Sequence, residues 1–487
     1  MSQSHETPTG VSYDVVVLGA GPAGANVAGR ARAAGLSVAV VERELVGGDC
    51  AYWACVPSKA LLRPVIALAD ARRVDGARQA VTGRADADGV FARRNRSVHD
   101  WDDTRQALFL KSIGADLFRG HGRLDGPRRV SVTRDDGARH TLTARHAVAI
   151  ATGSRPALPD IPGIAEARPW TNRQSTESST VPLRLAIIGG GGVGIEMATL
   201  WQGLGSQVTL LARRRLIPRM EPFAGELVAQ GLRESGADVR VGVQVTALRR
   251  PDPQGPVTLT LDDGSELEAD EVLCATGRTP VTDDIGLDTV GLAPGSWLDV
   301  DTTCLVQGVD GDWLYALGDV NHRALLTHQG KYQGRTAGDA IGARAAGRPL
   351  DDTPWGDHAT TADQLAVPQV FFSDPEAAAV GLSAEQAERS GYRIKTVDLD
   401  FNVVQGAKLY ADGYQGHARL VVDLDREVLL GATFVGPGIS ELLHSATIAV
   451  AGEVPLKRLR HAIASFPTVS EIWLFLLAAY QHDQEAS

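Results

Sequence analysis

The sequence contains little cysteine, with four residues of this type among 487. It has no excess of positive charge either, since 48 Lys and Arg stand against 59 Asp and Glu for a net charge of -11. That sign excludes reliance on phosphate-backbone contacts, so we expect no nucleic-acid partner. No hydrophobic run reaches the length of a membrane span, and residues 1–10 lack the apolar core of a secretory signal. We therefore expect a cytoplasmic protein with no membrane partner.

Two of the four cysteines lie close together, because the stretch GGDCAYWACVPSK contains both Cys50 and Cys55. The reducing cytosol disfavours structural disulfides, so a close pair there is more often catalytic, redox-sensing or metal-binding. The pattern therefore favours a functional pair, and the alternative is two buried cysteines. Cys274 and Cys304 have no partner nearby in the sequence, and we interpret them as ordinary core or surface residues.

A glycine motif near the amino end predicts a dinucleotide site. Residues 13–42 indicate a buried strand, a glycine turn, an Ala-rich helix and a second strand that ends in an acid. In such a βαβ unit Gly19 permits the tight turn, Gly21 lets a pyrophosphate approach the backbone, and Gly24 packs helix on strand. Glu42, at the end of the second strand, can bind a ribose hydroxyl.

A second copy of the motif follows in the stretch LRLAIIGGGGVGIEMATLWQGLGSQVTLLARRR. Its glycines at the same internal offsets are Gly189, Gly191 and Gly194. The position that corresponds to Glu42 is Ala212, and Arg213 and Arg214 come next. Arginine is expected there when the ribose carries a 2′-phosphate, which a carboxylate would repel and a guanidinium can grip. The pattern favours NADPH, with NADH possible, and the alternative is a solvated basic corner.

The sequence also indicates several domains, because a chain of this length with 44% hydrophobic residues can bury more than one core. The related segments ATGSRP (151–156) and ATGRTP (275–280) each follow an apolar run and mark crossings between domains. The predicted parts are a first dinucleotide-binding domain at 1–156 and 281–355, a second at 157–280 inserted into it, and a separate α+β domain at 356–487.

The motifs of this chain resemble those of the FAD-dependent pyridine nucleotide-disulfide oxidoreductases, which include dihydrolipoamide dehydrogenase, glutathione reductase, mercuric reductase and soluble transhydrogenase. The resemblance covers nearly the whole chain. It rests on the first glycine motif, GGDCAYWACVPSK, ATGSRP, GGGGVGIE, ATGRTP, YALGDV and DPEAAAVGL, in family order. It implies an α/β fold with two Rossmann-like domains, one for FAD and one for NAD(P), with ββα-type sheets and a carboxy-terminal α+β domain that forms a homodimer.

The resemblance also implies the cofactor contacts. Asp319 of the GDV motif would meet the ribityl chain of FAD, and Lys59 with Glu196 would match the family's pair near the flavin and the nicotinamide. Lys59 would then favour negative charge on the reduced flavin, and the alternative is a surface lysine and a helix-start acid. The other predicted cofactor-binding residues in these motifs are Gly48, Thr152, Gly153 and Gly277. We predict no metal site.

The spacing of Cys50 and Cys55 has a consequence if the segment is helical. On an ideal helix a separation of five residues (50 to 55) gives ~7.5 Å of rise and about 140° of rotation, so the Cα atoms lie ~8 to 9 Å apart. A relaxed disulfide needs less than about 7 Å, so a helix there must be distorted, and a strained bridge is easier to reduce. A helix amino end also favours the thiolate. By the resemblance, Cys55 sits against the flavin and Cys50 faces the substrate.

One family residue is missing. Members that reduce disulfides or oxidise dithiols use a His-Pro pair followed by a Glu, donated across the dimer, to move protons, which contributes ~10²- to 10⁴-fold in rate. In the matching stretch FPTVSE the histidine position is Phe466, and Glu471 keeps its place as a predicted structural remnant. His461 could replace the base only if the loop shifts register; otherwise it is a helix-end or surface histidine. We interpret His328, near the flavin by resemblance, as structural.

Aromatic residues next to the cysteines are also unusual for dihydrolipoamide dehydrogenase. Tyr52 and Trp53, together with Phe466, indicate an aromatic wall around Cys50, or else packing of the helix on its neighbours. Mercuric reductase shares the Phe-Pro pair but delivers metal through a carboxy-terminal cysteine pair, which is not found here. Soluble transhydrogenase lacks the second cysteine of the motif, which is found here.

We therefore predict an oxidoreductase that passes hydride from NADPH through FAD to the Cys50–Cys55 disulfide. The small-molecule electron acceptor would be one that needs no histidine: a quinone, a soft metal ion held by thiolates, or another small oxidant. A first alternative is dihydrolipoamide dehydrogenase or a low-molecular-weight disulfide reductase with a substitute base. A second alternative is a redox-responsive flavoprotein that serves as a binding partner.

Overall fold

The computed structural model describes residues 10–485, with side chains described up to residue 482. Its residue contacts divide the chain into two compact units. Unit 1 comprises Met1–Val56, Asn95–Arg155 and Arg278–Gln364, and unit 2 comprises Pro57–Arg94, Pro156–Gly277 and Leu365–Ser487. Within the part that is described, no helix has both the length and the apolar character needed to cross a membrane.

Unit 1 is built on a seven-stranded sheet. In sheet order, with β16 beside β6, its strands are β3 (Asp116–Arg119), β2 (Val38–Glu42), β1 (Gly10–Leu18), β6 (Arg139–Ile150), β5 (Arg129–Thr133), β4 (His121–Leu124) and β16 (Leu314–Ala316). The strands β3, β2, β1, β6 and β16 run parallel, while β4 and β5 form an antiparallel extension. The apolar run at 15–18 of β1 is fully buried, as expected for a strand covered on both faces.

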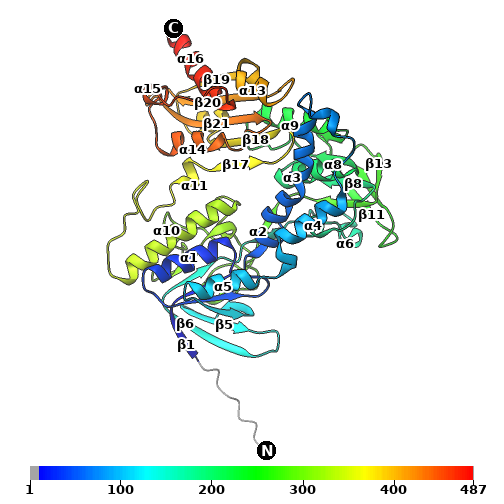
Figure 1. Ribbon diagram of the computed structural model, residues 1–487. Helices are drawn as coiled ribbons and strands as arrows, with labels where there is room; N and C mark the ends of the chain where they lie inside the picture. Colours follow the sequence, from blue (N-terminus) through cyan, green and yellow to red (C-terminus); the bar gives the residue numbers. More distant parts are fainter. Residues whose placement is uncertain (1–9, 486–487) are drawn as a thin grey trace, which may run out of the picture. The chain divides into compact units, whose positions relative to one another are not determined.

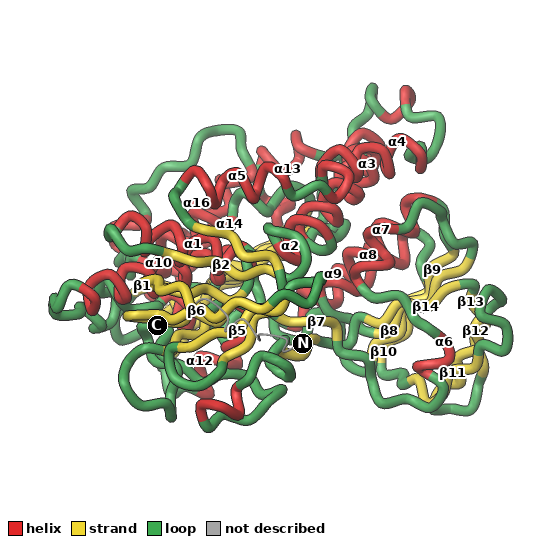
Figure 2. Tube along the Cα trace, turned by 90° about the horizontal axis from the view of Figure 1, so that it is seen from below, coloured by secondary structure: helices red, strands yellow, loops and turns green. Residues whose placement is uncertain are grey.

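Two long helices of unit 1 pack against each other beside this sheet. They are α1 (Pro22–Ala33) and α10 (Thr327–Ala345), which lie side by side in both views (Figures 1 and 2). The approach is close because Gly334 of α10 faces the backbone of Ala23, and Gly338 faces Arg30. The other elements of unit 1 are β7 (Ser154–Pro156), β15 (Arg278–Pro280), α2 (Gly48–Tyr52), α5 (Thr104–Ser112), η2 (His99–Trp101), η3 (Leu287–Val290) and η4 (Gly318–Asn321).

Unit 2 contains the second βαβ motif. Its parallel sheet has the order β10 (Asp238–Val241), β9 (Gln207–Ala212), β8 (Arg184–Ile188), β14 (Glu271–Cys274). Helix α8 (Gly192–Leu204) follows β8 and lies beside these strands (Figure 2). The nearby elements are the antiparallel strands β11 (Val245–Arg249), β12 (Val257–Leu261) and β13 (Glu266–Ala269), with α6 (Ile164–Ala167), α7 (Asn172–Glu177), α9 (Pro222–Glu234) and η1 (Arg78–Ala80).

The rest of unit 2 is an antiparallel sheet with helices. In sheet order the strands are β17 (Pro368–Phe371), β18 (Glu376–Gly381), β21 (Val428–Gly436), β20 (His417–Asp423) and β19 (Ile394–Asp400). The helices are α12 (Ala384–Arg389), α13 (Gln405–Tyr410), α14 (Leu443–Ala451), α15 (Leu456–Leu459) and α16 (Ile472–Glu485), with η5 (Phe401–Val403) and η6 (Val469–Glu471). The central strand β21 is buried along its whole length.

Three helices cross the boundaries between the two units: α3 (Cys55–Arg72), α4 (Ala87–Ser97) and α11 (Ala362–Leu365). The two predicted βαβ motifs are present, and the predicted α/β class with a carboxy-terminal α+β part is confirmed. The predicted division at residues 156, 280 and 355 stays a prediction.

Candidate active site

The first glycine loop connects β1 to α1. Gly19 has φ of +99°, and a Cβ atom there would collide with the carbonyl group of Ala151. A Cβ atom on Gly24 would collide with the carbonyl oxygen of Gly19, so only glycine lets helix and strand come this close. Among the described residues, nothing beyond the chain neighbours lies within 4 Å of the Cβ position of Gly21. Open backbone therefore faces outward at the amino end of α1, where the helix dipole favours a pyrophosphate.

Glu42 closes this loop from the end of β2. Its Oε2 accepts a hydrogen bond from the backbone N–H of Ala20 at 2.7 Å, and its Oε1 accepts one from the N–H of Glu44 at 2.8 Å. Burial raises the pKa of Glu42, while these backbone donors act in the opposite direction. The carboxylate is thus fixed beside the glycine loop, and its contact with a ribose hydroxyl stays a prediction.

Asp319 lies in η4, three residues after the end of β16 (Ala316 to Asp319 across Leu317 and Gly318). Its Oδ2 accepts a hydrogen bond from Ser154 Oγ at 2.5 Å, and Arg278 Nε lies 3.7 Å from the same oxygen. Burial raises the pKa of Asp319, while the hydrogen bond from Ser154 and the charge of Arg278 oppose that rise. The motifs ATGSRP, ATGRTP and YALGDV therefore meet through one polar cluster.

The remaining predicted FAD contacts lie in glycine-rich turns. The Cβ position of Gly48 lies 3.1 Å from the Cα atom of Gly21, so the GGD turn packs on the glycine loop. Gly153 and Gly277 have φ of +73° and +142°, which side chains rarely adopt. Thr152 uses its hydroxyl within the protein, since Oγ1 donates to the carbonyl of Val281 at 2.7 Å. The open backbone at the glycine loop and the carboxylates beside it fit a bound FAD.

The two motif cysteines lie on either side of a helix break. Cys50 is in α2, which ends at Tyr52, and α3 begins anew at Cys55. The predicted distortion is therefore present as an interruption between the cysteines. The sulfurs are not bonded to each other, and the hydrogen bond between the two thiols, together with burial and the charge of Cys55, raises the pKa of Cys50. Cys50 therefore retains its proton and donates it towards the sulfur of Cys55.

Cys55 has a hydroxyl neighbour from a distant part of the sequence. Its Sγ lies 3.2 Å from Thr327 Oγ1, at the start of α10. Thr327 is also a partner of Cys50, and the charge of Lys331, one turn further along α10, lowers the pKa of Cys50. Two amino ends, those of α3 and α10, therefore meet at the sulfurs, and both favour negative charge there.

Lys59 and Glu196 form an ion pair between α3 and α8. Lys59 Nζ lies 2.5 Å from Glu196 Oε2, and the side chain of Glu196 is almost fully buried. The other carboxylate oxygen accepts a hydrogen bond from the backbone N–H of Phe372 at 3.1 Å, and the Phe372 ring lies 5.1 Å from the Lys59 ammonium. The structure thus brings together the two residues paired by the sequence analysis, while their role towards cofactors stays a prediction.

The second glycine loop repeats the geometry of the first. Gly189 has φ of +123°, and a Cβ atom there would meet the carbonyl of Ala275, just as Gly19 meets Ala151. A Cβ atom on Gly194 would collide with Gly189, and the Cβ position of Gly191 is open among the described residues. These glycines fit a second dinucleotide, with its pyrophosphate at the amino end of α8.

The end of β9 differs from the end of β2. Ala212 replaces the acid, and its Cβ lies 2.9 Å from the Cβ position of Gly190. Arg213 and Arg214 are exposed, and neither forms a hydrogen bond or ion pair with another residue in the described ranges. Arg215 instead donates to the carbonyl oxygens of Pro218 and Met220. Two cations therefore remain available beside this loop, while the third stabilises the protein.

The aromatic residues that meet α8 were not among the predicted site residues. A Cβ atom on Gly192 would collide with the ring of Phe371, at the end of β17, and the adjacent Phe372 touches the Lys59–Glu196 pair. No local pattern marks these two phenylalanines, because their contacts join segments that are far apart in the sequence. Thr327, Ser154 and Arg278 were missed as site residues for the same reason.

The comparison with known proteins identifies the family. Residues 13–336 match the family described as pyridine nucleotide-disulphide oxidoreductase, and residues 367–474 match the dimerisation domain of the same family. The chain belongs to this family. It is an oxidoreductase of the flavoprotein type, with FAD and NAD(P)H as cofactors.

Curated relatives of this oxidoreductase cover almost its whole length. A mercuric reductase of Staphylococcus aureus is 31% identical over 98% of this chain and 83% of its own length. Dihydrolipoyl dehydrogenase 3 of Pseudomonas aeruginosa is 33% identical over 94% of this chain and 96% of its own length. The predicted membership of the disulfide oxidoreductases is therefore confirmed, while the relatives differ in their named substrates.

Solved structures support the fold. The HOCl-induced flavoprotein disulfide reductase RclA from Escherichia coli superposes with a TM-score of 0.79 and 24% identity, covering 96% of this chain and 99% of its own. LpdA from Mycobacterium tuberculosis gives a TM-score of 0.81 with the same identity and coverage. The oxidoreductase thus has the flavoprotein disulfide reductase fold.

The stretch FPTVSE of this oxidoreductase presents its phenylalanine outward. The side chain of Phe466 is 73% exposed. Glu471 is buried, and its Oε2 has no hydrogen-bond partner among the residues that the structure describes. His461 is exposed, and its Nε2 accepts a long hydrogen bond of 3.5 Å from Arg460. A buried carboxylate oxygen without a donor fits the loss of a hydrogen-bonding side chain from this stretch.

The other residues singled out near the cysteines lie as follows. Tyr52 is fully buried and its ring centroid lies 5.7 Å from that of Trp53, so the burial of Tyr52 favours the packing alternative over an aromatic wall. His328 is exposed in the first turn of α10. Cys274 is a buried core residue, and burial raises the pKa of its thiol to about 12. Cys304 is fully buried as well.

A buried polar network holds the turn that carries Asp319. Asp363 accepts hydrogen bonds from Gln329 and from Gln333, both at 2.8 Å. Oε1 of Gln333 in turn accepts from the backbone N–H of Gly318 at 2.7 Å and from Asn321 at 2.9 Å. The side chain of Asp363 is fully buried, and this burial raises its pKa to about 6.

This network predicts a pH effect on stability. The folded state binds the Asp363 proton more tightly than the unfolded chain does, so the contribution of this group to stability rises as the pH falls from about 6 towards 4. We expect the unfolding free energy of Asp363→Asn to respond less than that of the wild type to a change from pH 7 to pH 5, by about 1 kcal/mol. Urea unfolding of the FAD-loaded proteins measures this difference.

The exposed Asp352 supplies the matched control, since Asp352→Asn removes a carboxylate from the same unit without altering the network. Its pH response should equal that of the wild type. Identical pH responses of the wild type and Asp363→Asn would show that Asp363 does not titrate in this range.

Proposed function

We propose that this oxidoreductase takes hydride from NADPH, reduces the Cys50–Cys55 disulfide and delivers the two electrons to a small oxidant that needs no imidazole, with quinones as the first class to test. The observation that carries the proposal is the combination of a close thiol pair with Phe466 at the acid-base position. When bound, FAD accepts the hydride and passes two electrons to the disulfide.

The thiol pair supports the redox step. Reduction of the disulfide takes up two electrons and two protons, and oxidation of the dithiol releases the same numbers. Cys55 lies at the amino end of α3 with Thr327 Oγ1 at 3.2 Å, an arrangement that stabilises a thiolate. Cys50, whose pKa is raised by its hydrogen bond to Cys55, stays protonated longer and retains its proton until the acceptor is reduced.

The residues around the second glycine loop support a nicotinamide cofactor. The backbone at Gly191 is open, and the exposed Arg213 and Arg214 follow β9, which supports contact of these cations with a ribose 2′-phosphate. Glu196 is held by Lys59 and by the Phe372 backbone, so its carboxylate is fixed in direction. A fixed charge pair of this kind orients a ring that binds beside it without reorganisation.

The stretch FPTVSE supports an acceptor other than a disulfide. Exchange with a disulfide needs a proton for each leaving thiolate, and phenylalanine supplies none. The exposure of Phe466 agrees with a surface that a second copy would cover, and the matched dimerisation domain supports a homodimer in which each copy completes the other's site.

A second candidate function follows from the relatives. The 33% identity to a dihydrolipoyl dehydrogenase favours a dihydrolipoamide substrate, and the 31% identity to a mercuric reductase favours a soft metal ion held by the thiolates. Anaerobic stopped-flow experiments separate these candidates. The NADPH-reduced protein is mixed in turn with a quinone, lipoamide, glutathione disulfide and Hg²⁺. Fast reoxidation by the disulfides, equal to that by quinones, would contradict the proposal. Failure of NADPH to reduce the protein at all would favour a binding protein.

The arginines after β9 give a prediction about cofactor choice. We expect NADPH to be the more efficient hydride donor. The double substitution Arg213→Ala and Arg214→Ala should weaken the binding of NADPH by ~1 to 3 kcal/mol for each charged hydrogen bond lost. The efficiency with NADH should hardly change, because its ribose carries no 2′-phosphate. Initial rates of flavin reduction against cofactor concentration give both values.

The control for this pair is Arg249→Ala, which removes an exposed arginine from β11 of the same unit. It should leave the preference between the two cofactors unchanged. Equal efficiency of NADPH and NADH in the wild type would identify Arg213 and Arg214 as solvated surface residues.

A further inference from the structure

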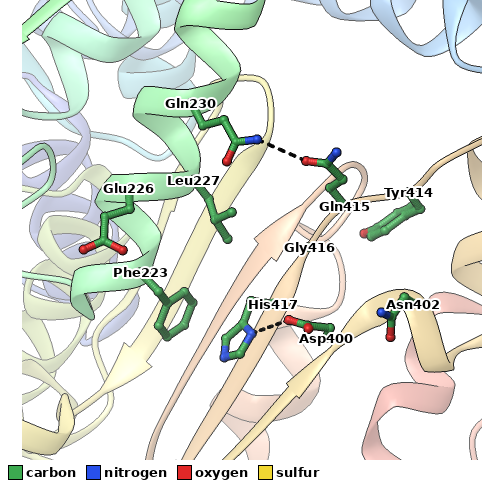
Figure 3. Close-up of a pocket in the computed structure, with 10 residues that line it drawn as sticks. All are labelled: Phe223, Glu226, Leu227, Gln230, Asp400, Asn402, Tyr414, Gln415, Gly416 and His417. Atoms are coloured by element: carbon green, nitrogen blue, oxygen red, sulfur yellow. Dashed lines mark hydrogen bonds and ion pairs between the residues drawn. The ribbon is translucent and has the colours of Figure 1, made fainter.

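Two cavities formed by described residues contain none of the predicted site residues, and they differ in their charge balance. The first, of about 410 Å³, lies in unit 2 between α9 and the strands β19 and β20 (Figure 3). Its histidine is paired, because His417 binds Asp400 at 2.7 Å and Asp398 at 3.0 Å, and the neighbouring Arg419 binds Glu221 at 3.0 Å. Its lining carboxylates, Glu226 and Asp400, outnumber its cations, so this cavity does not favour an anion.

The second cavity, of about 440 Å³, lies in unit 1 between β6, the turn before β16, and the carboxyl end of α10. Its volume is within the ~300 to 1,000 Å³ range of small-molecule sites. Arg128, Arg344 and Arg348 line it, with His146 beside them, and Asp312 is the one carboxylate among its lining residues. The cavity lining therefore contains three guanidinium groups and one carboxylate, although the net charge of the whole chain is -11.

The three guanidinium groups are not neutralised. None of them forms an ion pair with a carboxylate in the described part of the chain, whereas the nearby Arg145 pairs with Asp14 at 2.7 Å. The partners of Arg128 and Arg344 are neutral oxygens, which leave the positive charge in place. Arg128 donates to the carbonyl of Arg145 at 2.8 Å, and Arg344 donates to the hydroxyl of Tyr315 at 2.5 Å.

These neutral contacts also fix the direction of the cations. The guanidinium of Arg344 lies 5.6 Å from the ring of Tyr315, whose hydroxyl is buried and has its pKa raised to about 12. Arg128 has φ of +61°, a left-handed conformation that side chains adopt at a cost, yet the position holds an arginine whose Nη2 reaches the carbonyl of Gly311. The side chains of Arg128 and Arg344 are thus held by contacts within the protein, whereas Arg348 is exposed.

The helix dipole explains only part of this arrangement. Arg344 in the last turn of α10 and Arg348 just after it lie where cations stabilise a helix end. Arg128, however, comes from the turn before β5 and His146 from β6, so these side chains reach the same cavity from other elements. Convergence from three elements is the pattern of an anion site.

We propose that this cavity binds a small anion that carries a diphosphate group, separately from the FAD and nicotinamide sites. Three guanidinium forks provide bidentate donors for phosphate oxygens, and their excess charge matches a group with several negative charges. The diphosphate could be free pyrophosphate or part of a nucleotide such as ADP, and the two sources share this chemistry.

Isothermal titration of the FAD-loaded protein with sodium pyrophosphate, at constant ionic strength, tests the site. We expect saturable binding of one pyrophosphate per chain, weakened at least ~10-fold in Arg128→Gln and, independently, in Arg348→Gln. The matched control is Arg335→Gln, which removes an exposed arginine of α10 outside the cavity and should leave the affinity unchanged. FAD content and thermal unfolding of each variant show that the fold is retained.

A parallel titration with ADP distinguishes the sources, because tighter binding of ADP at the same site would identify a nucleotide, and equal or weaker binding would identify the free diphosphate. Three outcomes would overturn the proposal: no pyrophosphate binding to the wild type, binding that survives in both Arg128→Gln and Arg348→Gln, or an equal loss in Arg335→Gln. NADPH oxidation by Arg348→Gln should remain at the wild-type rate, so a failure here is distinguishable from a failure of the proposed redox function.

Discussion

Replacement of Cys55 by Ser should abolish the long-wavelength absorption band that two-electron reduction of the FAD-loaded protein produces. This band requires a thiolate in contact with oxidised FAD, and we expect Cys55 to provide it, because Cys50 donates a hydrogen bond to the Cys55 sulfur. Turnover with acceptors that react at the dithiol should fall by ~10³-fold or more, as is typical when a nucleophile is removed. Anaerobic titration with dithionite, followed by absorption spectra, provides the measurement.

Cys50→Ser is the matched variant, because it removes the other sulfur and leaves Cys55 next to Thr327. The two cysteines can no longer form a disulfide, so the Cys55 thiolate and its band should be present before any reductant is added. Hydride transfer from NADPH should continue in both variants, since the second glycine loop and the Lys59–Glu196 pair are unaltered. Wild-type protein that bleaches directly, with no band at any stage of the titration, would contradict a redox-active disulfide.

Both dinucleotide folds were predictable from the sequence because their determinants are local. Within each motif, the first glycine takes a left-handed turn, the second leaves open backbone and the third admits the helix, all within a few residues. The difference between Glu42 in the first motif and Ala212 in the second was predictable in the same way, since each residue ends the second strand of its motif. The interruption between Cys50 and Cys55 was also predictable, given the helix that the family resemblance implies and a disulfide that an ideal helix cannot close.

The contacts that complete the site were not predictable, because they join residues that are distant in the sequence. Nothing near Thr327 indicates a cysteine partner, and nothing near Phe372 indicates that its backbone N–H binds Glu196. Burial is equally invisible in a local pattern. The sequence around Asp363 has a composition typical of a surface loop. The side chain of Asp363 is nevertheless fully buried and linked through Gln333 to the turn of Asp319.

We expect Phe466 to limit which acceptors the proposed dithiol can serve. In disulfide exchange the imidazole of the family protonates one leaving thiolate and accepts the proton of the other, and its absence removes this route. Transfer of electrons to a quinone needs no such shuttle at the sulfurs, because the oxidant takes up its protons from water. The orphaned Oε2 of the buried Glu471 marks the place where a histidine ring would find its hydrogen-bond acceptor.

We therefore expect NADPH-dependent reduction of quinones to be fast, and turnover of dihydrolipoamide and glutathione disulfide to be slower by at least ~100-fold, the lower end of general acid-base contributions. Phe466→His should raise disulfide turnover, because Glu471 can then orient the ring, and should leave the reductive half-reaction unchanged. Phe466→Leu serves as the control that alters the side chain without adding a base. Steady-state rates with both acceptor classes, measured also for His461→Ala, decide the question. Efficient disulfide turnover by the wild type that collapses in His461→Ala would show that His461 is the base, and the assignment of an imidazole-free site would then be wrong.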